Sequence, residues 1–431
     1  MTDTRNSSVA YDPQKLSLGG SINALIALGR IPLASEVPLW TIFGCILSAR
    51  LFPSTGAVKG ITSIDWWVVF QCAFTTWATN ISINYGNEFF DWNLDRPGQV
   101  ESIKKAVRAR EELMNKEKKG QAVREQQEQE EKVHEFNEKI MGNTTRIIHD
   151  GTFPPYTALV LGAAWQAAVI GLIFYSRSKD ASLHTIKPTS AHGSPYRGLP
   201  LQIGIISSIL SQMYVGPPVR LHYHGFGELI SALLLNPVAI LFGMTGYYTA
   251  TTGRAVHLSD LFTTSTSGFN LGPVWVLLGA MYCFEQARIF IMHIQDIEAD
   301  IAGGKITFVV RVGHAMAARL YVIFNILALG LFGLFTRIHH IPHHGLKANH
   351  LNTFSRGWKQ GITAVLLYSI PIMIITARSL FAQIPPGRLS TASQQGGGLF
   401  APRLLTVLPM LVSLQVLLSP IVLSIFTLLN W

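Results

Sequence analysis

Two groups of acidic side chains recur at helical spacing, each at the end of an apolar stretch. The first group comprises Asn84, Asn87, Glu88, Asp91 and Asp95. At about 100° per residue, these side chains fall within roughly a 100° arc of one helix. Like charges at this spacing repel, so the pattern calls for a compensating cation. Such oxygen ligands suit Mg²⁺, which commonly bridges one or two carboxylates to substrate phosphates.

The second group contains Asp296 and Asp300, which again lie four residues apart on one helix face. Glu285 and Arg288 precede them by one or more turns and could pair with each other. Lys305 follows as a compact cation that could contact a phosphate. A single pair of acids at a helix end is usually a solvated cap. Two such groups on the same side of the molecule favour a shared site for a metal ion and a diphosphate.

The elements that carry these groups belong to a chain with few charges. Of its 431 residues, 48% are hydrophobic and 14% are charged, whereas about a quarter are charged in an average soluble domain. Twenty of the 59 charged residues fall within residues 101–140, which leaves the remainder suited to a lipid environment. The net charge of +9 is not accompanied by a basic face interleaved with aromatics, so we expect no nucleic-acid partner. The charge fits loops against anionic lipid and an anionic substrate.

Nine apolar segments approach the length of about 20 residues that crosses a bilayer. Because backbone polar groups in lipid must be satisfied internally, each is predicted to be a helix. The chain is therefore expected to be an all-α, polytopic membrane protein with nine transmembrane helices. The segments are Val37–Phe52, Trp66–Ile83, Tyr156–Tyr175, Leu199–Val215, Phe226–Tyr247, Gly272–Met292, Ala315–Phe335, Gly361–Leu380 and Leu404–Leu429.

The predicted domain organisation is simple. Residues 1–36 form an N-terminal segment with an interfacial helix, and residues 37–431 form the transmembrane domain. Residues 101–140 are a charged helical insertion, which is either solvated or binds a partner. With nine spans, the acidic groups share the side richer in Lys and Arg, which indicates the cytosolic side of an endomembrane or plasma membrane.

The two acidic motifs resemble those of the UbiA superfamily of membrane prenyltransferases. The family pattern is N-D-x-x-D-x-x-x-D at the end of the second helix and D-x-x-x-D at the end of the sixth. Here the first motif runs from Asn87 to Asp95, with Glu88 in place of an aspartate, and the second runs from Asp296 to Asp300. The segments YVGPP at 214–218 and HGFGE at 224–228 look most like the MenA branch, which prenylates dihydroxynaphthoate. His293 and Gln295 depart from the Asn and Arg usual in that branch.

The resemblance implies Mg²⁺-dependent transfer of an isoprenyl group from a prenyl diphosphate to an aromatic or quinone-precursor acceptor. Asp91, Asp95, Asp296 and Asp300 would be the catalytic carboxylates, and with Asn87 and Glu88 they would form the metal ligands. The diphosphate would be held by Arg146, Tyr214, Arg220 and Lys305. The residues expected behind these ligands are Asn84, Glu285 and Arg288. Trp77, Phe89, Phe90, Met213 and Met292 could line a pocket for an allylic cation, or they could be ordinary helix packing.

Two other functions fit parts of this pattern. A UbiA-type terpene cyclase would capture the ionised chain with its own double bond and would need no acceptor. A membrane transporter could use the acids as ion sites, although transporter acids usually lie near the bilayer midplane. The histidine-rich segment 339–344 could bind a metal, but the predicted topology places it on the opposite side from the acidic groups.

Overall fold

The computed structural model describes most of the chain between residues 18 and 429, and within this part the protein is helical. One isolated parallel β-bridge joins Gly198 and Val256, and the described residues contain no strand. The all-α prediction is therefore confirmed. The described residues are 18–31, 33–52, 64–91, 153–183, 193–262, 269, 271–272, 274–302, 305–337, 348–382 and 401–429.

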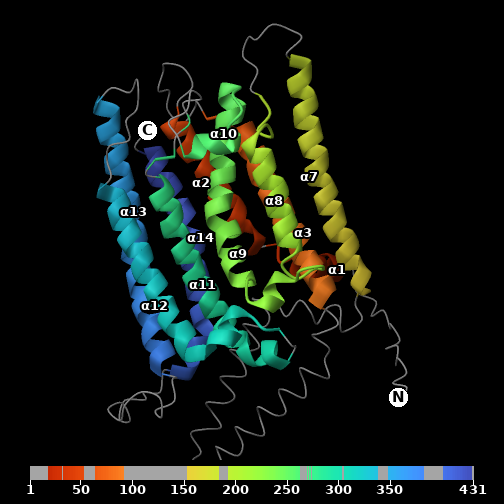
Figure 1. Ribbon diagram of the computed structural model, residues 1–431, viewed down its shortest axis with the longest axis vertical. Coiled ribbons are helices and arrows are strands. Elements are labelled where there is room, and N and C mark those ends of the chain that lie inside the picture. Colours follow the sequence, from red (N-terminus) through yellow and green to blue (C-terminus); the bar gives the residue numbers. More distant parts are fainter. Residues whose placement is uncertain are drawn as a thin grey trace, which may run out of the picture.

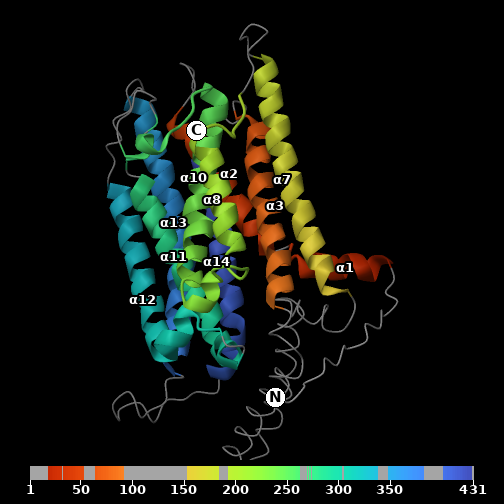
Figure 2. The same cartoon turned by 45° about the vertical axis from the view of Figure 1, so that its right-hand side comes forward.

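The long helices run alongside one another in a single bundle, whereas α1 lies at a steep angle to them beside the lower ends of α3 and α7 (Figures 1 and 2). The helices are α1 (Leu18–Leu28), α2 (Glu36–Leu51), α3 (Trp66–Asp91), α7 (Pro155–Leu183), α8 (Leu199–Gln212), α9 (Gly227–Leu233), α10 (Ala239–Thr252), α11 (Val274–Ala302), α12 (Phe308–Arg337), α13 (Ala348–Ala382) and α14 (Ala401–Leu429). Short helical turns complete the described elements, namely η1 (Leu33–Ser35), η3 (Leu221–His224), η4 (Leu234–Val238) and η5 (Leu258–Leu261).

Six helical stretches in the described part are long and apolar enough to cross a membrane. Large apolar side chains such as Phe174, Ile326 and Leu367 are exposed on the outside of the bundle, where lipid would cover them. The protein is thus an integral membrane protein. The predicted count of nine spans is not confirmed. The six stretches are Pro155–Ser178, Gly227–Thr252, Val274–Ile297, Phe308–Arg337, Gly357–Phe381 and Leu408–Leu429.

The core of the bundle is built around α2, which packs against α3, α10 and α14. Trp40 and Phe43 of α2 are completely buried there. Two glycines let α2 and α10 approach closely: a Cβ on Gly44 would lie 2.2 Å from the carbonyl oxygen of Ile240. A Cβ on Gly243 would likewise lie 2.2 Å from the carbonyl oxygen of Thr41. Small residues of this kind are what close helix packing in membranes requires.

The bundle brings the ends of three helices together. In both views α3, α8 and α11 finish toward the lower end of the bundle (Figures 1 and 2). The two acidic groups occupy the ends of α3 and α11, so helix direction alone places them at one end of the molecule. The charged insertion at 101–140 and the histidine-rich segment at 339–344 lie outside the described residues, as do Asp95 and Arg146.

Candidate functional site

Asp91, the last residue of α3, is held by two side chains from distant parts of the chain. The hydroxyl of Tyr223 in η3 donates a hydrogen bond of 2.6 Å to Oδ1 of Asp91. The ammonium of Lys305, which follows α11, lies 3.1 Å from Oδ2 of the same carboxylate. Both contacts involve the charged carboxylate of Asp91, and such charge-assisted contacts are stronger than hydrogen bonds between neutral groups. Asp91 is therefore the point at which α3, η3 and the end of α11 meet.

The remaining members of the first acidic group have different surroundings. The carboxylate of Glu88 is fully buried, and its Oε1 lies 2.8 Å from Nη2 of Arg30, just after α1. The side-chain amide of Asn84 donates to the carbonyl oxygen of Gly29 over 3.1 Å. Both contacts fasten the end of α1 to α3. Asn87 lies between these residues on α3 and is partly exposed.

The second acidic group closes the site from the side of α11. Asp300 is buried, with its Oδ2 3.4 Å from the hydroxyl of Thr307, whereas Asp296, one turn earlier, is exposed. The backbone N–H of Lys305 donates to the carbonyl oxygen of Asp300 over 2.8 Å, which returns the chain toward Asp91. Burial and the nearby charge of Asp296 raise the pKa of Asp300 to about 7, although Lys305 and Thr307 oppose the shift. Asp300 thus lies near a second carboxylate in a buried position, where its charged form is disfavoured.

The loop between α8 and α9 supplies the third wall of the site. The backbone N–H groups of Leu221 and His222 donate to the carbonyl oxygens of Met213 and Tyr214, both over 2.9 Å. This pairing stacks the rings of Tyr214 and His222, whose centroids are 4.8 Å apart. A Cβ on Gly227 would lie 2.7 Å from Cα of His222, so only glycine permits this close approach.

Two cations lie near the ring of Tyr223. Nζ of Lys305 lies 5.8 Å from the centroid of this ring, and Cζ of Arg220 lies 5.6 Å from it. Arg220 is exposed and has a positive φ of 51°, a conformation that costs energy for a side chain other than glycine. Two of the predicted diphosphate ligands, Arg220 and Lys305, therefore lie beside Tyr223, and a third, Tyr214, stacks on the neighbouring His222. The fourth, Arg146, lies outside the described residues.

A buried ionic cluster lies deeper along α11. The guanidinium of Arg288 donates to both carboxylate oxygens of Glu285, which confirms that these two residues pair. Its Nη2 also lies 3.2 Å from Oε2 of Glu36, at the start of α2. Asn236, in the π-helical turn η4, donates to Glu285 over 3.2 Å. The cluster links α2, η4 and α11, and thereby fixes α11 behind the site.

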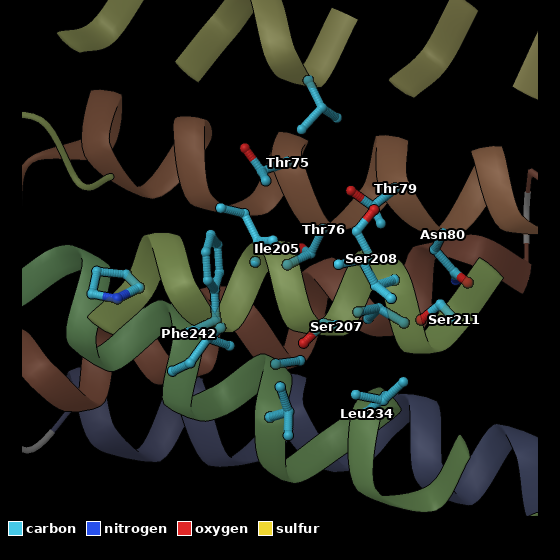
Figure 3. Close-up of a pocket in the computed structure, with 18 of the residues that line it drawn as sticks. Thr75, Thr76, Thr79, Asn80, Ile205, Ser207, Ser208, Ser211, Leu234 and Phe242 are labelled. Atoms are coloured by element: carbon cyan, nitrogen blue, oxygen red, sulfur yellow. The ribbon is translucent and has the colours of Figure 1, made fainter. Parts of the chain in front are cut away.

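A mostly apolar cavity of about 290 Å³ lies among α3, α7, α8 and the α9–α10 segment (Figure 3). Its volume is close to the lower end of the range for small-molecule pockets, about 300–1,000 Å³. Asn80 and Ile83 of α3 line it together with Ser208 and Ser211 of α8. At 1.5 Å per residue, Ile83 lies about 12 Å along α3 from Asp91. The cavity therefore extends along α3 in the direction of the acidic end.

The polar contacts at the site involve residues that the sequence motifs did not single out. Tyr223 binds Asp91, but it lies in the sequence between the two short segments that resemble the MenA branch and belongs to neither. The only feature of the sequence that could have indicated a role for it is that its phenol lies close to Arg220. Arg30 pairs with Glu88 from a segment that no motif covers. In contrast, Trp77 packs against Trp165 with ring centroids 5.5 Å apart, which is ordinary packing between α3 and α7.

Comparisons with known proteins give matches both in sequence and in structure. No family model matches the chain. The chain is 28% identical to 2-carboxy-1,4-naphthoquinone phytyltransferase from Synechocystis sp. over 115 residues. These 115 residues are 27% of this chain. The resemblance to UbiA-type prenyltransferases is confirmed. The matched region spans only 31% of that relative's length. A solved structure of digeranylgeranylglyceryl phosphate synthase aligns over 93% of this chain and 98% of its own, with 15% identity and a TM-score of 0.43.

Proposed function

We propose that this protein is an Mg²⁺-dependent membrane prenyltransferase, which moves an isoprenyl group from a prenyl diphosphate to an aromatic or quinone-precursor ring. The observation that carries the proposal is the contact between Lys305 and Asp91, because it joins the acidic ends of α3 and α11. The apolar cavity beside α3 adds space for a hydrocarbon chain. Similarity to a naphthoquinone phytyltransferase supports both the donor and a ring acceptor.

The acidic side chains fit a magnesium ion. Lys305 joins the two acidic helix ends, because its Nζ lies 3.1 Å from Oδ2 of Asp91 and its backbone N–H donates to the carbonyl oxygen of Asp300. We therefore assign Asp91 of α3 and Asp296 and Asp300 of α11 as ligands of one Mg²⁺ bound to a diphosphate. The raised pKa of Asp300, which burial and Asp296 cause, is what a nearby divalent cation would relieve. Asn87, Glu88 and Asp95 complete the proposed ligand set, and Glu88 would share its carboxylate with Arg30. The bound metal would neutralise the charge of the leaving diphosphate.

The basic and phenolic residues of the site would position the diphosphate. Lys305 contacts Asp91, and both Lys305 and Arg220 lie near the ring of Tyr223, at 5.8 Å and 5.6 Å from its centroid. We assign both to the diphosphate oxygens, together with Tyr214 and Arg146. Tyr223 holds the carboxylate of Asp91 in place through its hydroxyl.

The proposed reaction is an electrophilic substitution. The bond between the allylic carbon and the diphosphate oxygen breaks, and its electron pair leaves with the diphosphate. The electrons of the acceptor ring form a new carbon–carbon bond to the allylic carbon, and that ring position then loses its proton. The cavity lined by Ile83, Ile205 and Phe242 would hold the prenyl tail and exclude water from the allylic cation.

The membrane arrangement follows from the same bundle. Besides the six apolar stretches, α2, α3 and α8 run alongside them in the bundle (Figures 1 and 2). α2 is mostly buried, so it needs little apolar surface of its own toward lipid. We propose that these three also cross the bilayer, which gives nine spans with the acidic end toward the cytosol. α1 would lie in the interface at that end.

The proposal is tested with purified protein in lipid nanodiscs. Radiolabelled prenyl diphosphates of several chain lengths are supplied with dihydroxynaphthoate, with and without Mg²⁺. We expect label to appear in a prenylated ring product, and we expect EDTA or Asp91→Ala to abolish it. A cyclic hydrocarbon formed without acceptor would instead indicate a terpene cyclase. If no Mg²⁺-dependent product forms from any donor, the proposal fails.

A further inference from the structure

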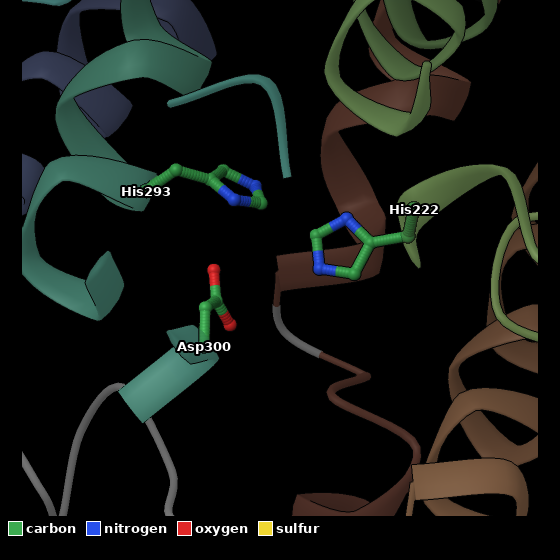
Figure 4. Close-up of side chains that lie close together, drawn as sticks. All are labelled: His222, His293 and Asp300. Carbon is green, nitrogen blue, oxygen red and sulfur yellow. The ribbon is translucent and has the colours of Figure 1, made fainter. Parts of the chain in front are cut away.

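Three ligand-type side chains converge beside the proposed diphosphate site. One ligand atom each of His222, His293 and Asp300 lie within 4.8 Å of one another, and the three side chains point toward a common space (Figure 4). They come from η3, from the body of α11 and from its end. Metal–ligand bonds of about 2.0–2.2 Å place neighbouring ligands about 3–4 Å apart. Small ring rotations would therefore bring these three atoms around one ion.

The two imidazoles have unsatisfied atoms in a buried place. Nδ1 of His222 and Nδ1 of His293 are both buried and have no hydrogen-bond partner among the described residues. Only 6% of His222 is exposed, and only 16% of the side chain of His293. Buried polar atoms without a partner are uncommon because each one costs free energy. An ion bound to Nδ1 of His222 and a closer approach of Glu228 to Nδ1 of His293 would satisfy both atoms.

The surroundings hold both rings in orientations suited to ligation. The ring of His222 stacks on Tyr214, and its centroid is 5.2 Å from that of His293. Oε1 of Glu228 lies 4.0 Å from Nδ1 of His293, and Oε2 of Glu228 is also buried without a partner. A carboxylate behind a ligating histidine usually accepts its second ring N–H and fixes the ring. In the proposed site Glu228 would move closer and accept from Nδ1 of His293, and the other ring nitrogen of His293 would bind the ion.

The chemistry of this set differs from that of the acidic group on α3. Two imidazole nitrogens and one carboxylate suit first-row transition metals, whereas Mg²⁺ prefers oxygen ligands alone. We propose that His222, His293 and Asp300 form a site for a divalent transition-metal ion, with Glu228 orienting His293. Any catalytic role of this ion rests on the proposed function. Asp300 would then bind both this ion and the Mg²⁺ of the diphosphate site.

Metal binding can be measured without any activity. Protein without a histidine tag is stripped with EDTA, returned to nanodiscs, and titrated with Co²⁺ in excess Mg²⁺ while visible absorption is recorded. We expect one equivalent of Co²⁺ to bind and to give the bands of a histidine-ligated ion. His222→Ala and His293→Ala should each remove these bands, and Glu228→Gln should weaken Co²⁺ binding about 10- to 100-fold. His224→Ala is the matched control, because His224 lies in the same loop, is exposed, and contacts the carbonyl oxygen of Arg220.

Two results would overturn the site. The first is an unchanged Co²⁺ spectrum in both histidine variants, and the second is the absence of Co²⁺ binding in excess Mg²⁺. If a variant fails to fold, electron spin-echo modulation of Mn²⁺ bound to the wild-type protein decides, because imidazole ligation must give nitrogen coupling. Cobalt binding without prenyl transfer would refute the proposed function and leave the site intact. Prenyl transfer without cobalt binding would refute the site alone.

Discussion

Lys305 and Asp91 are 214 residues apart in the chain, yet Nζ of one lies 3.1 Å from Oδ2 of the other. Both side chains are largely buried, with 11% and 16% exposed, so the pair is screened less than a surface ion pair. Asp91 ends α3, and Lys305 follows α11. Their contact links the end of α3 to the segment that follows α11, and it places a cation where a diphosphate would need one.

Removal of the Lys305 charge is expected to weaken binding of the prenyl diphosphate. A hydrogen bond to a charged group contributes about 1.5–3 kcal/mol, which corresponds to roughly a 10- to 150-fold change in affinity. Lys305→Ala should therefore raise the KM for prenyl diphosphate by at least about 10-fold, and Lys305→Arg should recover part of the loss. Steady-state kinetics in nanodiscs measure the effect. Lys359→Ala, which removes an exposed cation on α13, is the control, and an equal KM in both variants would contradict the assignment.

The hydroxyl of Tyr223 is expected to matter for metal affinity more than for stability. Tyr223→Phe deletes only the donor that contacts Asp91 over 2.6 Å, so the carboxylate loses its orientation while the ring remains. We expect the Mg²⁺ concentration for half-maximal activity to rise about 10-fold, in line with about 1.5 kcal/mol for such a bond. Tyr156→Phe, an exposed phenol on α7, should leave it unchanged. An unaltered Mg²⁺ dependence in Tyr223→Phe would show that this contact is incidental.

The pair between Arg30 and Glu88 is expected to stabilise the attachment of α1 to α3. Loss of one partner of a fully buried ion pair costs about 3–5 kcal/mol. Because 43% of the Arg30 side chain is exposed, solvent reduces the cost for Arg30→Ala to about 1–3 kcal/mol. Thermal unfolding in detergent should show a lower Tm for Arg30→Ala. The double variant Arg30→Ala with Glu88→Gln should recover part of this loss, since no uncompensated charge remains. Additive losses would argue against a direct pair.

The cavity is expected to set the length of prenyl chain that the protein accepts. Gly204 of α8 lines it, and a Cβ there would lie 3.5 Å from Cε2 of Phe242, so a larger side chain must extend into the cavity. Gly204→Leu should raise the KM for long prenyl diphosphates more than for short ones, because the tail loses buried contact area. Competition between two donors of different length measures the ratio. Gly171→Leu on the exposed side of α7, where nothing lies within 4 Å of the new Cβ, should leave the ratio unchanged.

The sequence alone determined the helical class, the membrane environment and the identity of the acidic residues. Hydrophobic runs of about 20 residues leave the backbone no alternative to helix in lipid, and acids repeated every three or four residues share a helix face whatever surrounds that helix. Pairing of Glu285 with Arg288 was predictable for the same reason, because residues three apart on a helix are neighbours. The helical class, the shared helix face and the Glu285–Arg288 pair all depend on the spacing of nearby residues, which can be read directly from the sequence.

The tertiary structure decided which residues from different helices meet. No local pattern indicates that Tyr223 binds Asp91, that Arg30 pairs with Glu88, or that His222 faces His293 from another helix. Such contacts depend on how α3, α8 and α11 pack and on the path of the loop after α8, where Gly227 allows close approach. Packing geometry sums many small interactions along whole helices, so it is settled by the folded bundle and not by any single motif.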